Sequence, residues 1–312
     1  MEYGALRALR SAPHVIAVGS GKGGSGKTTL AMHVVVYLLK AGQRIGTLDL
    51  DSDQGGLTRY IENRERWANH RHIDLVLPWH NHISSARGER TDEIESRELA
   101  QLQEAIAPME ASCDFLVIDA PSHDNYLTGV AHLMADTVLT PLQDSFLDLG
   151  ALGLVDPLTH EVTHTGHYAA TVCAARKLRR QFDPAFVDWV VIVNRPCDPP
   201  LVKPCLRDLA LRIGFKDAAG CAERAAYRQL FSLGLTAFDA LDEATLGACP
   251  TESHLAAQKE MRALMDGLRL PVSQRGLRQA AARSEWLKRR EMPLVLDDIV
   301  AEAQLEPAEG GL

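Results

Sequence analysis

A glycine-rich segment with two lysines contains the residues best suited to chemistry. Residues 20–29 read Ser-Gly-Lys-Gly-Gly-Ser-Gly-Lys-Thr-Thr, which from Gly21 fits the pattern G-x-x-x-x-G-K-S/T. In this pattern small residues let backbone N–H groups surround phosphate oxygens, while a lysine reaches the terminal phosphates and a hydroxyl binds Mg²⁺. The sequence therefore predicts a nucleoside triphosphate site with Mg²⁺. Its expected binding residues are Gly23, Gly24, Ser25, Gly26, Lys27, Thr28 and Thr29.

Two other interpretations of this loop compete with that one. A plain turn between a strand and a helix needs one or two glycines and has no use for Lys27 and the threonine after it. Gly21, Gly23 and Gly26 also spell G-x-G-x-x-G, with Asp49 roughly twenty residues further on, which is the dinucleotide fingerprint of many oxidoreductases. A dinucleotide loop gains nothing from the lysine-threonine pair, whereas a triphosphate loop requires both residues. The triphosphate interpretation is therefore preferred.

Acidic residues follow two segments that read as strands. Asp49, Asp51 and Asp53 lie at the C-terminal end of the predicted strand 44–48, and an apolar segment ends in Asp119 in the Walker B manner. The carboxyl ends of parallel strands meet at the edge of a sheet where ligands bind. We therefore expect one or more of the first three carboxylates to face Mg²⁺ or its waters, with a solvated turn as the alternative. Asp119 is expected to hold a water of the Mg²⁺ shell.

These residues require a scaffold in which strands alternate with helices. Apolar segments predict strands at 15–19, 44–48, 115–119, 137–141 and 188–193, and helices at 28–40 and 98–109. This alternation indicates a doubly wound α/β fold with a mostly parallel sheet flanked by helices. The 312 residues suit one such domain over residues 1–270. Residues 271–312 are expected to form a C-terminal extension, helical and then acidic.

Composition narrows the class of protein. Hydrophobic residues make up 46% and charged residues 24% of the chain, which excludes wholesale disorder. No secretory leader or membrane-spanning segment is visible, and the six cysteines form no C-x-x-C pair, so we expect a reduced cytoplasmic protein. Residues 297–312 carry five acidic residues and no Lys or Arg, which disfavours a membrane anchor.

Histidine-containing segments raise the alternative of a metal site. His160 to His164 reads H-E-x-x-H, the zinc pattern of metalloproteases when it lies on a helix. Nearby proline, threonine and glycine residues are poor helix formers, so we interpret this segment, with His167 beyond it, as solvated. The pairs His70/His72 and His80/His82 are interpreted as parts of a solvated loop, because no third ligand stands at zinc-site spacing.

A basic segment predicts contact with a polyanion. The segment from Arg176 to Lys216 contains nine Arg and Lys residues and four Asp residues. Its net charge is therefore +5, in a chain whose net charge is −8. Such a segment could bind nonspecific DNA through its phosphates. An ordinary charged helix face is the alternative.

The second lysine of the loop points to a family. The run from Lys22 to Thr28 resembles the deviant Walker A motif of the ParA/MinD family of ATPases. In that family ATP is sandwiched between two protomers, and the resemblance implies that Lys22 contacts the phosphates bound by the partner subunit. It also implies that Asp51 orients or deprotonates the attacking water and that Asn194 reads adenine, with turn capping as an equal alternative for Asn194. The implied catalytic residues are Lys22, Lys27 and Asp51, and the implied metal residues are Thr28, Asp51 and Asp119.

Further segments are similar to the MipZ branch of this family, over roughly residues 13–270. They lie at residues 144–146, 155–157, 188–191, 224–236 and 255–265. This branch implies an ATP-dependent homodimer that hydrolyses ATP slowly, binds DNA nonspecifically, interacts with a ParB-like protein and inhibits FtsZ, and so places the cell-division site. A ParA-type chromosome or plasmid partition ATPase is the nearest alternative. Ser122 stands where the family usually has a switch II glycine, and we expect the site to function with it.

Overall fold

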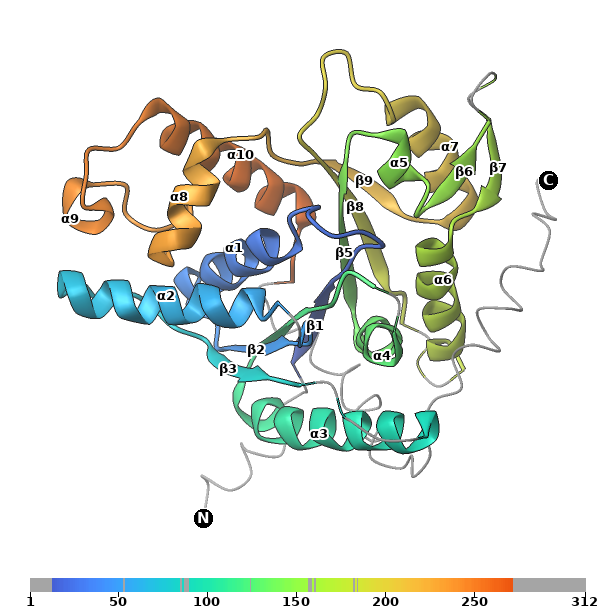
Figure 1. Ribbon diagram of the computed structural model, residues 1–312, viewed down its shortest axis with the longest axis horizontal. Helices are drawn as coiled ribbons and strands as arrows, with labels where there is room; N and C mark the ends of the chain where they lie inside the picture. Colours follow the sequence, from blue (N-terminus) through green and yellow to red (C-terminus); the bar gives the residue numbers. More distant parts are fainter. Residues whose placement is uncertain are drawn as a thin grey trace.

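The centre of the molecule is a seven-stranded parallel sheet in the order β3-β2-β4-β1-β5-β8-β9 (Figure 1). The computed structural model describes residues 13–271 except positions 53, 85, 87–89, 124, 157, 158, 160, 182 and 184. The sheet confirms the doubly wound α/β fold. Its strands are β1 (His14–Val18), β2 (Ile45–Asp49), β3 (Trp79–His82), β4 (Phe115–Asp119), β5 (Thr137–Gln143), β8 (Asp188–Asn194) and β9 (Lys216–Ala219).

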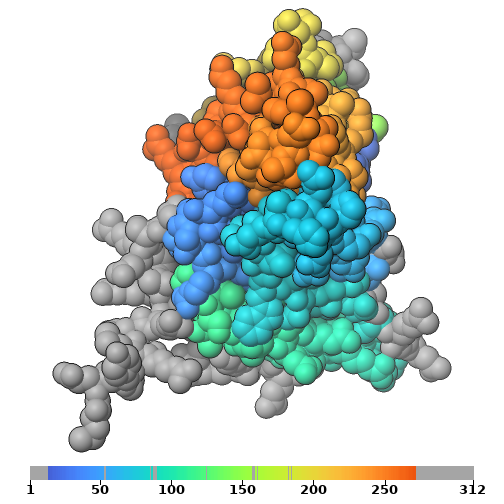
Figure 2. Space-filling view, turned by 90° about the vertical axis from the view of Figure 1, so that its left-hand side faces the viewer, coloured from blue at the N-terminus to red at the C-terminus, as the bar shows by residue number. Residues whose placement is uncertain are grey.

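Helices cover both faces of this sheet. One face packs against α1 (Lys27–Lys40), α2 (Gly56–Arg71), α8 (Ala225–Leu233) and α10 (Glu252–Leu268). The other packs against α3 (Thr91–Ser112), α4 (Tyr126–Met134), α6 (His167–Arg179) and α7 (Lys203–Ile213). Figure 2 shows the orange segment around α8 and α10 lying against α1 and α2. The short helices α5 (Phe146–Leu149) and α9 (Glu243–Leu246) and the hairpin β6 (Gly153–Val155) and β7 (Val162–Thr165) lie outside these two layers.

The central strands are buried on both sides, which explains their continuous apolar sequence. In β1, Val15 packs into one core layer and Ile16 into the other, because side chains alternate across a strand. The register places Val18 and Asp49 each opposite Asp119, so the ends of β1, β2 and β4 meet at one edge of the sheet. This shared edge positions the candidate site.

The interpretation of the segment around the paired histidines as a solvated loop is wrong. His70 lies in α2, and His72 caps that helix with a left-handed backbone at φ 55°. His80 and His82 lie on β3. Helix α2 forms because Leu57 and its neighbours on the same side enter the core. The many charges between these apolar residues obscure the helical period in the sequence.

His164 lies on the strand β7, so this part of the H-E-x-x-H sequence is extended, whereas His160 falls outside the described residues. Within the described part of the chain, no group of three or more His, Cys, Asp or Glu residues is arranged to hold a metal ion. Among the described helices, none is long and apolar enough to cross a bilayer. The proposed boundary between a domain and an extension at residue 270 stays a prediction.

Candidate nucleotide-binding site

The phosphate loop connects β1 to α1 at the shared edge of the sheet. Gly24 and Gly26 have φ angles of 78° and 99°, in the left-handed region that favours glycine. Ser20 braces the loop, since its hydroxyl donates to the Lys22 carbonyl at 2.8 Å and lies 2.8 Å from the hydroxyl of Ser25. The loop leads directly into the N-terminus of α1, whose free N–H groups and dipole favour an anion.

Lys27 is the first residue of α1, directly after the loop, and is 7% exposed. Its ammonium group donates to the hydroxyl of Ser122 at 2.8 Å, and to the Lys22 carbonyl and the Ser20 hydroxyl at 3.2 Å each. Burial lowers the pKa of Lys27, while the nearby carboxylates of Asp119 and Asp51 oppose this effect. The lysine is thus held by neutral oxygens, which the charged oxygens of a phosphate could replace with a stronger attraction. One of these oxygens belongs to Ser122, the residue that differs from the usual glycine of the family pattern.

Thr28 and Asp119 form the part of the site suited to Mg²⁺. The Thr28 hydroxyl donates to one carboxylate oxygen of Asp119 at 2.7 Å. The other oxygen of Asp119 is buried and, among the described residues, has no hydrogen-bond partner. Burial raises the pKa of Asp119 to about 7, and the carboxylates of Asp49 and Asp51 add to this effect. A hydrated divalent cation would supply the missing partner and favour the charged carboxylate, so the residues present fit Mg²⁺.

The acidic residues after β2 have different positions. Asp49 is fully buried, and its carboxylate accepts hydrogen bonds from the Asp51 N–H and from the N–H and hydroxyl of Thr58. It therefore fixes the start of α2 instead of facing the nucleotide. Asp51 lies at the edge of the site, where its carboxylate accepts from the N–H of Gln54 at 3.1 Å. Its role with the attacking water stays a prediction, and Asp53 lies outside the described residues.

Lys22, predicted to reach a partner subunit, is held within its own chain. Its ammonium group lies 2.8 Å from the carboxylate of Asp148 in α5. The Lys22 side chain is 42% exposed and that of Asp148 is 2% exposed. The same carboxylate also accepts from the N–H of Gln143 and the hydroxyl of Ser145, both at 3.2 Å. Asp148 is a site residue that sequence analysis missed, because no local motif links it to the loop.

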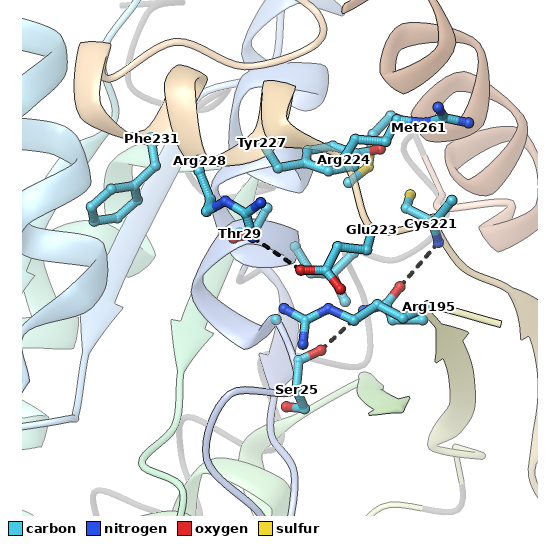
Figure 3. A pocket seen from close by; sticks show the side chains of 14 residues that line it. Ser25, Thr29, Arg195, Cys221, Glu223, Arg224, Tyr227, Arg228, Phe231 and Met261 are labelled. Atoms are coloured by element: carbon cyan, nitrogen blue, oxygen red, sulfur yellow. Dashed lines mark hydrogen bonds and ion pairs between the residues drawn. The ribbon is translucent and has the colours of Figure 1, made fainter. Parts of the chain in front are cut away.

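A cavity of about 250 Å³ adjoins the loop on the side of α8 (Figure 3). Asn194 lines it and connects its two sides: the amide donates to the Ser25 carbonyl at 3.1 Å and accepts from the N–H of Cys221 at 3.1 Å. Arg228 pairs with Glu223 at 2.9 Å across the cavity (Figure 3). Asn194 thus lines the cavity and holds the loop to the end of β9. Adenine reading by its remaining amide hydrogen and lone pair stays a prediction.

The basic segment 176–216 is only partly available for a polyanion. Arg176 and Arg179 are 8% and 1% exposed. Arg176 donates to the carbonyls of Ile213 and Gly214, and Arg179 is paired with Asp136 and Asp183. These two arginines stabilise the packing of α6 and add little exposed charge, and contact of the segment with a polyanion stays a prediction. The exposed Arg180, Arg195, Lys203 and Arg207 are compatible with that prediction.

Comparisons with known proteins agree with this geometry. A family model described as ATPase MipZ matches residues 14–272. The chain is 34% identical over 150 residues to the chromosome-partitioning ATPase Soj of Treponema pallidum, and 30% identical over 169 residues to the chromosome partitioning protein ParA of Myxococcus xanthus. The first match covers 43% of this chain and 58% of its relative, the second 47% and 57%, so the chain spans less than two thirds of either relative.

The fold is also that of solved structures. Apo McdA of Cyanothece has a TM-score of 0.55 at 18% identity, with 82% of this chain and 99% of McdA covered. An ATP complex of a substituted McdA from the same source has a TM-score of 0.53 at 16% identity, with 83% and 97% covered. These likenesses concern the fold alone, whereas the family model extends over the sheet, the phosphate loop and the helices of both faces. The chain belongs to the MipZ family of ParA/MinD-type ATPases.

Proposed function

We propose that the protein is an ATP-dependent dimerisation switch that hydrolyses ATP slowly and regulates the placement of the cell-division site. The observation that carries this proposal is the pair of lysines in one loop. Lys27 is buried at the phosphate position, while Lys22 is 42% exposed and bound to a carboxylate that it can exchange for another anion. A phosphate-binding ATPase needs only the first lysine, and the second is suited to a nucleotide held by a facing subunit.

The positions of the site residues suggest a role for each of them. Lys27 and the N–H groups of residues 23–26 hold the phosphates, and Asn194 lies at the base. Thr28 and, through water, Asp119 hold Mg²⁺, which when bound neutralises charge on the phosphate oxygens. Asp51 orients the hydrolytic water. Lys22 releases Asp148 when a second protomer presents its triphosphate.

The finer biology rests on membership in the MipZ family. We propose that the ATP-bound dimer inhibits FtsZ assembly, interacts with a ParB-like protein and binds DNA nonspecifically through the exposed part of the basic segment, in the cytoplasm. A partition ATPase of ParA type is the second candidate, which the similarity to Soj and ParA favours. The dinucleotide alternative predicts affinity for NAD(P) that is indifferent to Lys27→Ala.

The test is sedimentation velocity on the wild-type protein with Mg²⁺ and either ATP or ADP. We expect dimers with ATP and monomers with ADP. Lys22→Ala should bind ATP yet stay monomeric. Lys27→Ala should lose ATP affinity by about 10- to 150-fold, because a buried charge-assisted contact to phosphate is removed. Lys259→Ala, at an exposed lysine of α10, serves as the matched control. A wild-type protein that remains monomeric with ATP would contradict the proposal.

Light scattering of FtsZ polymers separates the two candidate functions. A division regulator should suppress polymerisation when ATP is present and not when Lys22→Ala replaces the wild type. A partition ATPase should leave polymerisation unchanged and still dimerise with ATP. Failure of this second test alone would therefore leave the dimer switch in place.

A further inference from the structure

A second cavity, a groove of about 980 Å³, lies between α6, the C-terminal part of α7 and the hairpin β6–β7. Figure 1 shows these elements on the side of the molecule away from α2 and α8. The Arg and Lys side chains that line the groove are Arg176, Lys177, Arg180 and Arg212. Among the described residues, no Asp or Glu lines it. Lys177 and Arg180 are exposed, whereas Arg176 is 8% exposed and Arg212 pairs with Asp208 at 2.9 Å, so the accessible positive charge of the groove lies chiefly at the C-terminal end of α6.

Hydrogen bonds between the walls give the groove a fixed shape. Arg212 donates to the Val162 carbonyl at 2.8 Å, which joins α7 to β7. Arg176 donates to the carbonyls of Ile213 and Gly214 at 3.2 and 2.9 Å, which joins α6 to the end of α7. Because these arginines connect all three walls, the groove is a built feature and not a gap between independent segments.

Large apolar side chains stand exposed among these cations. Phe186 is 66% exposed, and Leu154 and Leu211 are 54% and 87% exposed. The guanidinium carbons of Arg176 and Arg180 lie 4.9 and 5.3 Å from the centre of the Phe186 ring. Exposed apolar groups beside a cluster of cations indicate a binding surface for a partner that is both apolar and acidic.

The chain contains one segment of this chemistry outside the described residues. Residues 294–303 read Leu-Val-Leu-Asp-Asp-Ile-Val-Ala-Glu-Ala, and no Lys or Arg follows Arg290. Leu296, Ile299 and Val300 recur at the spacing of one helix face, so a helix here would carry acidic residues on both sides of an apolar stripe. The charges and apolar groups of this segment complement those of the groove.

The connection is long enough. The described chain ends at Pro271, and the 22 residues from 272 to 293 could extend over roughly 70 Å. A domain of this size has a radius of gyration of about 18 Å, so its full width is roughly 50 Å. We propose that residues 294–303 dock in the groove of their own chain and thereby cover part of the basic segment 176–216.

Zero-length crosslinking of the native full-length protein with a carbodiimide tests this proposal. We expect an amide bond between the Lys177 amine and a carboxylate of Asp297, Asp298 or Glu302, identified by mass spectrometry of peptides. An equal mixture of isotopically labelled and unlabelled protein distinguishes bonds within one chain from bonds between chains. Bonds that form only between chains would show that a second copy occupies the groove, and would overturn the proposal.

The reactivity of a native thiol gives a second, independent measurement. Cys173 lines the groove, and its alkylation by iodoacetamide should accelerate several-fold when Asp297→Asn, Asp298→Asn and Glu302→Gln are combined. Phe186→Ala, an exposed position, should have the same effect without lowering the melting temperature. Glu306→Gln with Glu309→Gln, beyond the apolar stripe, is the matched control and should change nothing. A Cys173 that reacts equally fast in wild type and in the triple variant would overturn the proposal and favour an external acidic partner or nucleic acid.

Discussion

Replacement of Asp148 by Asn should strengthen ATP-dependent dimerisation. In the monomer Asp148 holds Lys22 at 2.8 Å, and Lys22 must leave it before it can contact a nucleotide on another subunit. A hydrogen bond between charged groups contributes roughly 1.5–3 kcal/mol. Because the Lys22 side chain is 42% exposed, solvent screening reduces this to about 1 kcal/mol. Loss of the carboxylate charge should therefore release each lysine about fivefold more readily.

The dimer contains two such lysines, so its dissociation constant should fall by roughly 25-fold, a change that sedimentation velocity at a series of protein concentrations can measure. The side-chain oxygen of the new Asn can still accept from the N–H of Gln143, which keeps α5 in place. Ser145→Ala is the control, since it removes a different hydrogen bond of Asp148 and should not tighten the dimer. A dissociation constant unchanged in Asp148→Asn, with normal ATP binding, would refute the view that this pair restrains Lys22.

Three further predictions concern metal binding, packing and pH. Thr28→Ala should abolish the Mg²⁺ dependence of ATP affinity, and Thr28→Ser should retain it, as titration calorimetry can show. The reason is that the Thr28 hydroxyl is bonded to one oxygen of Asp119, whose other oxygen has no partner among the described residues, and these groups together form the proposed Mg²⁺ site. Gly234→Ala should lower the free energy of unfolding by about 3 kcal/mol or more, since φ is +67° and a Cβ would lie 1.9 Å from a backbone nitrogen of α2. The control is Gly42→Ala, where φ is +78° and a Cβ would meet open space. Urea unfolding should show a loss of only about 1 kcal/mol for this control. Burial lowers the pKa of His33 to about 4. Below pH 6.5 the unfolded state therefore binds more protons than the folded state, and the free energy of unfolding should fall by up to about 3 kcal/mol as pH drops to 4. A His33→Gln variant whose stability has the same pH slope would contradict this.

The phosphate loop and the central strands could be predicted well from the sequence, because both depend on local patterns. Glycines at left-handed positions and a lysine-threonine pair identify the loop whatever surrounds it, and continuous apolar residues identify strands buried on both faces. The segment from α2 to β3 could not be predicted in this way, since three of the four side chains of the edge strand β3 are polar and the strand forms through backbone pairing with β2. Asp119 is recognisable as an acidic strand end, but only the sheet register places it opposite Asp49.

Contacts between distant residues had to come from the tertiary structure. Lys22 and Asp148 are 126 positions apart, and no sequence pattern near either residue predicts that the two side chains meet. Arg176 and Arg179 counted as surface charge in the sequence, yet both are buried against carbonyl and carboxylate groups of other elements. The sequence by itself determined the phosphate-loop motif beside β1, because that motif lies within ten consecutive residues. Only the fold decided which charges remain for a partner, because a charged side chain is neutralised by what packs against it and not by its neighbours along the chain.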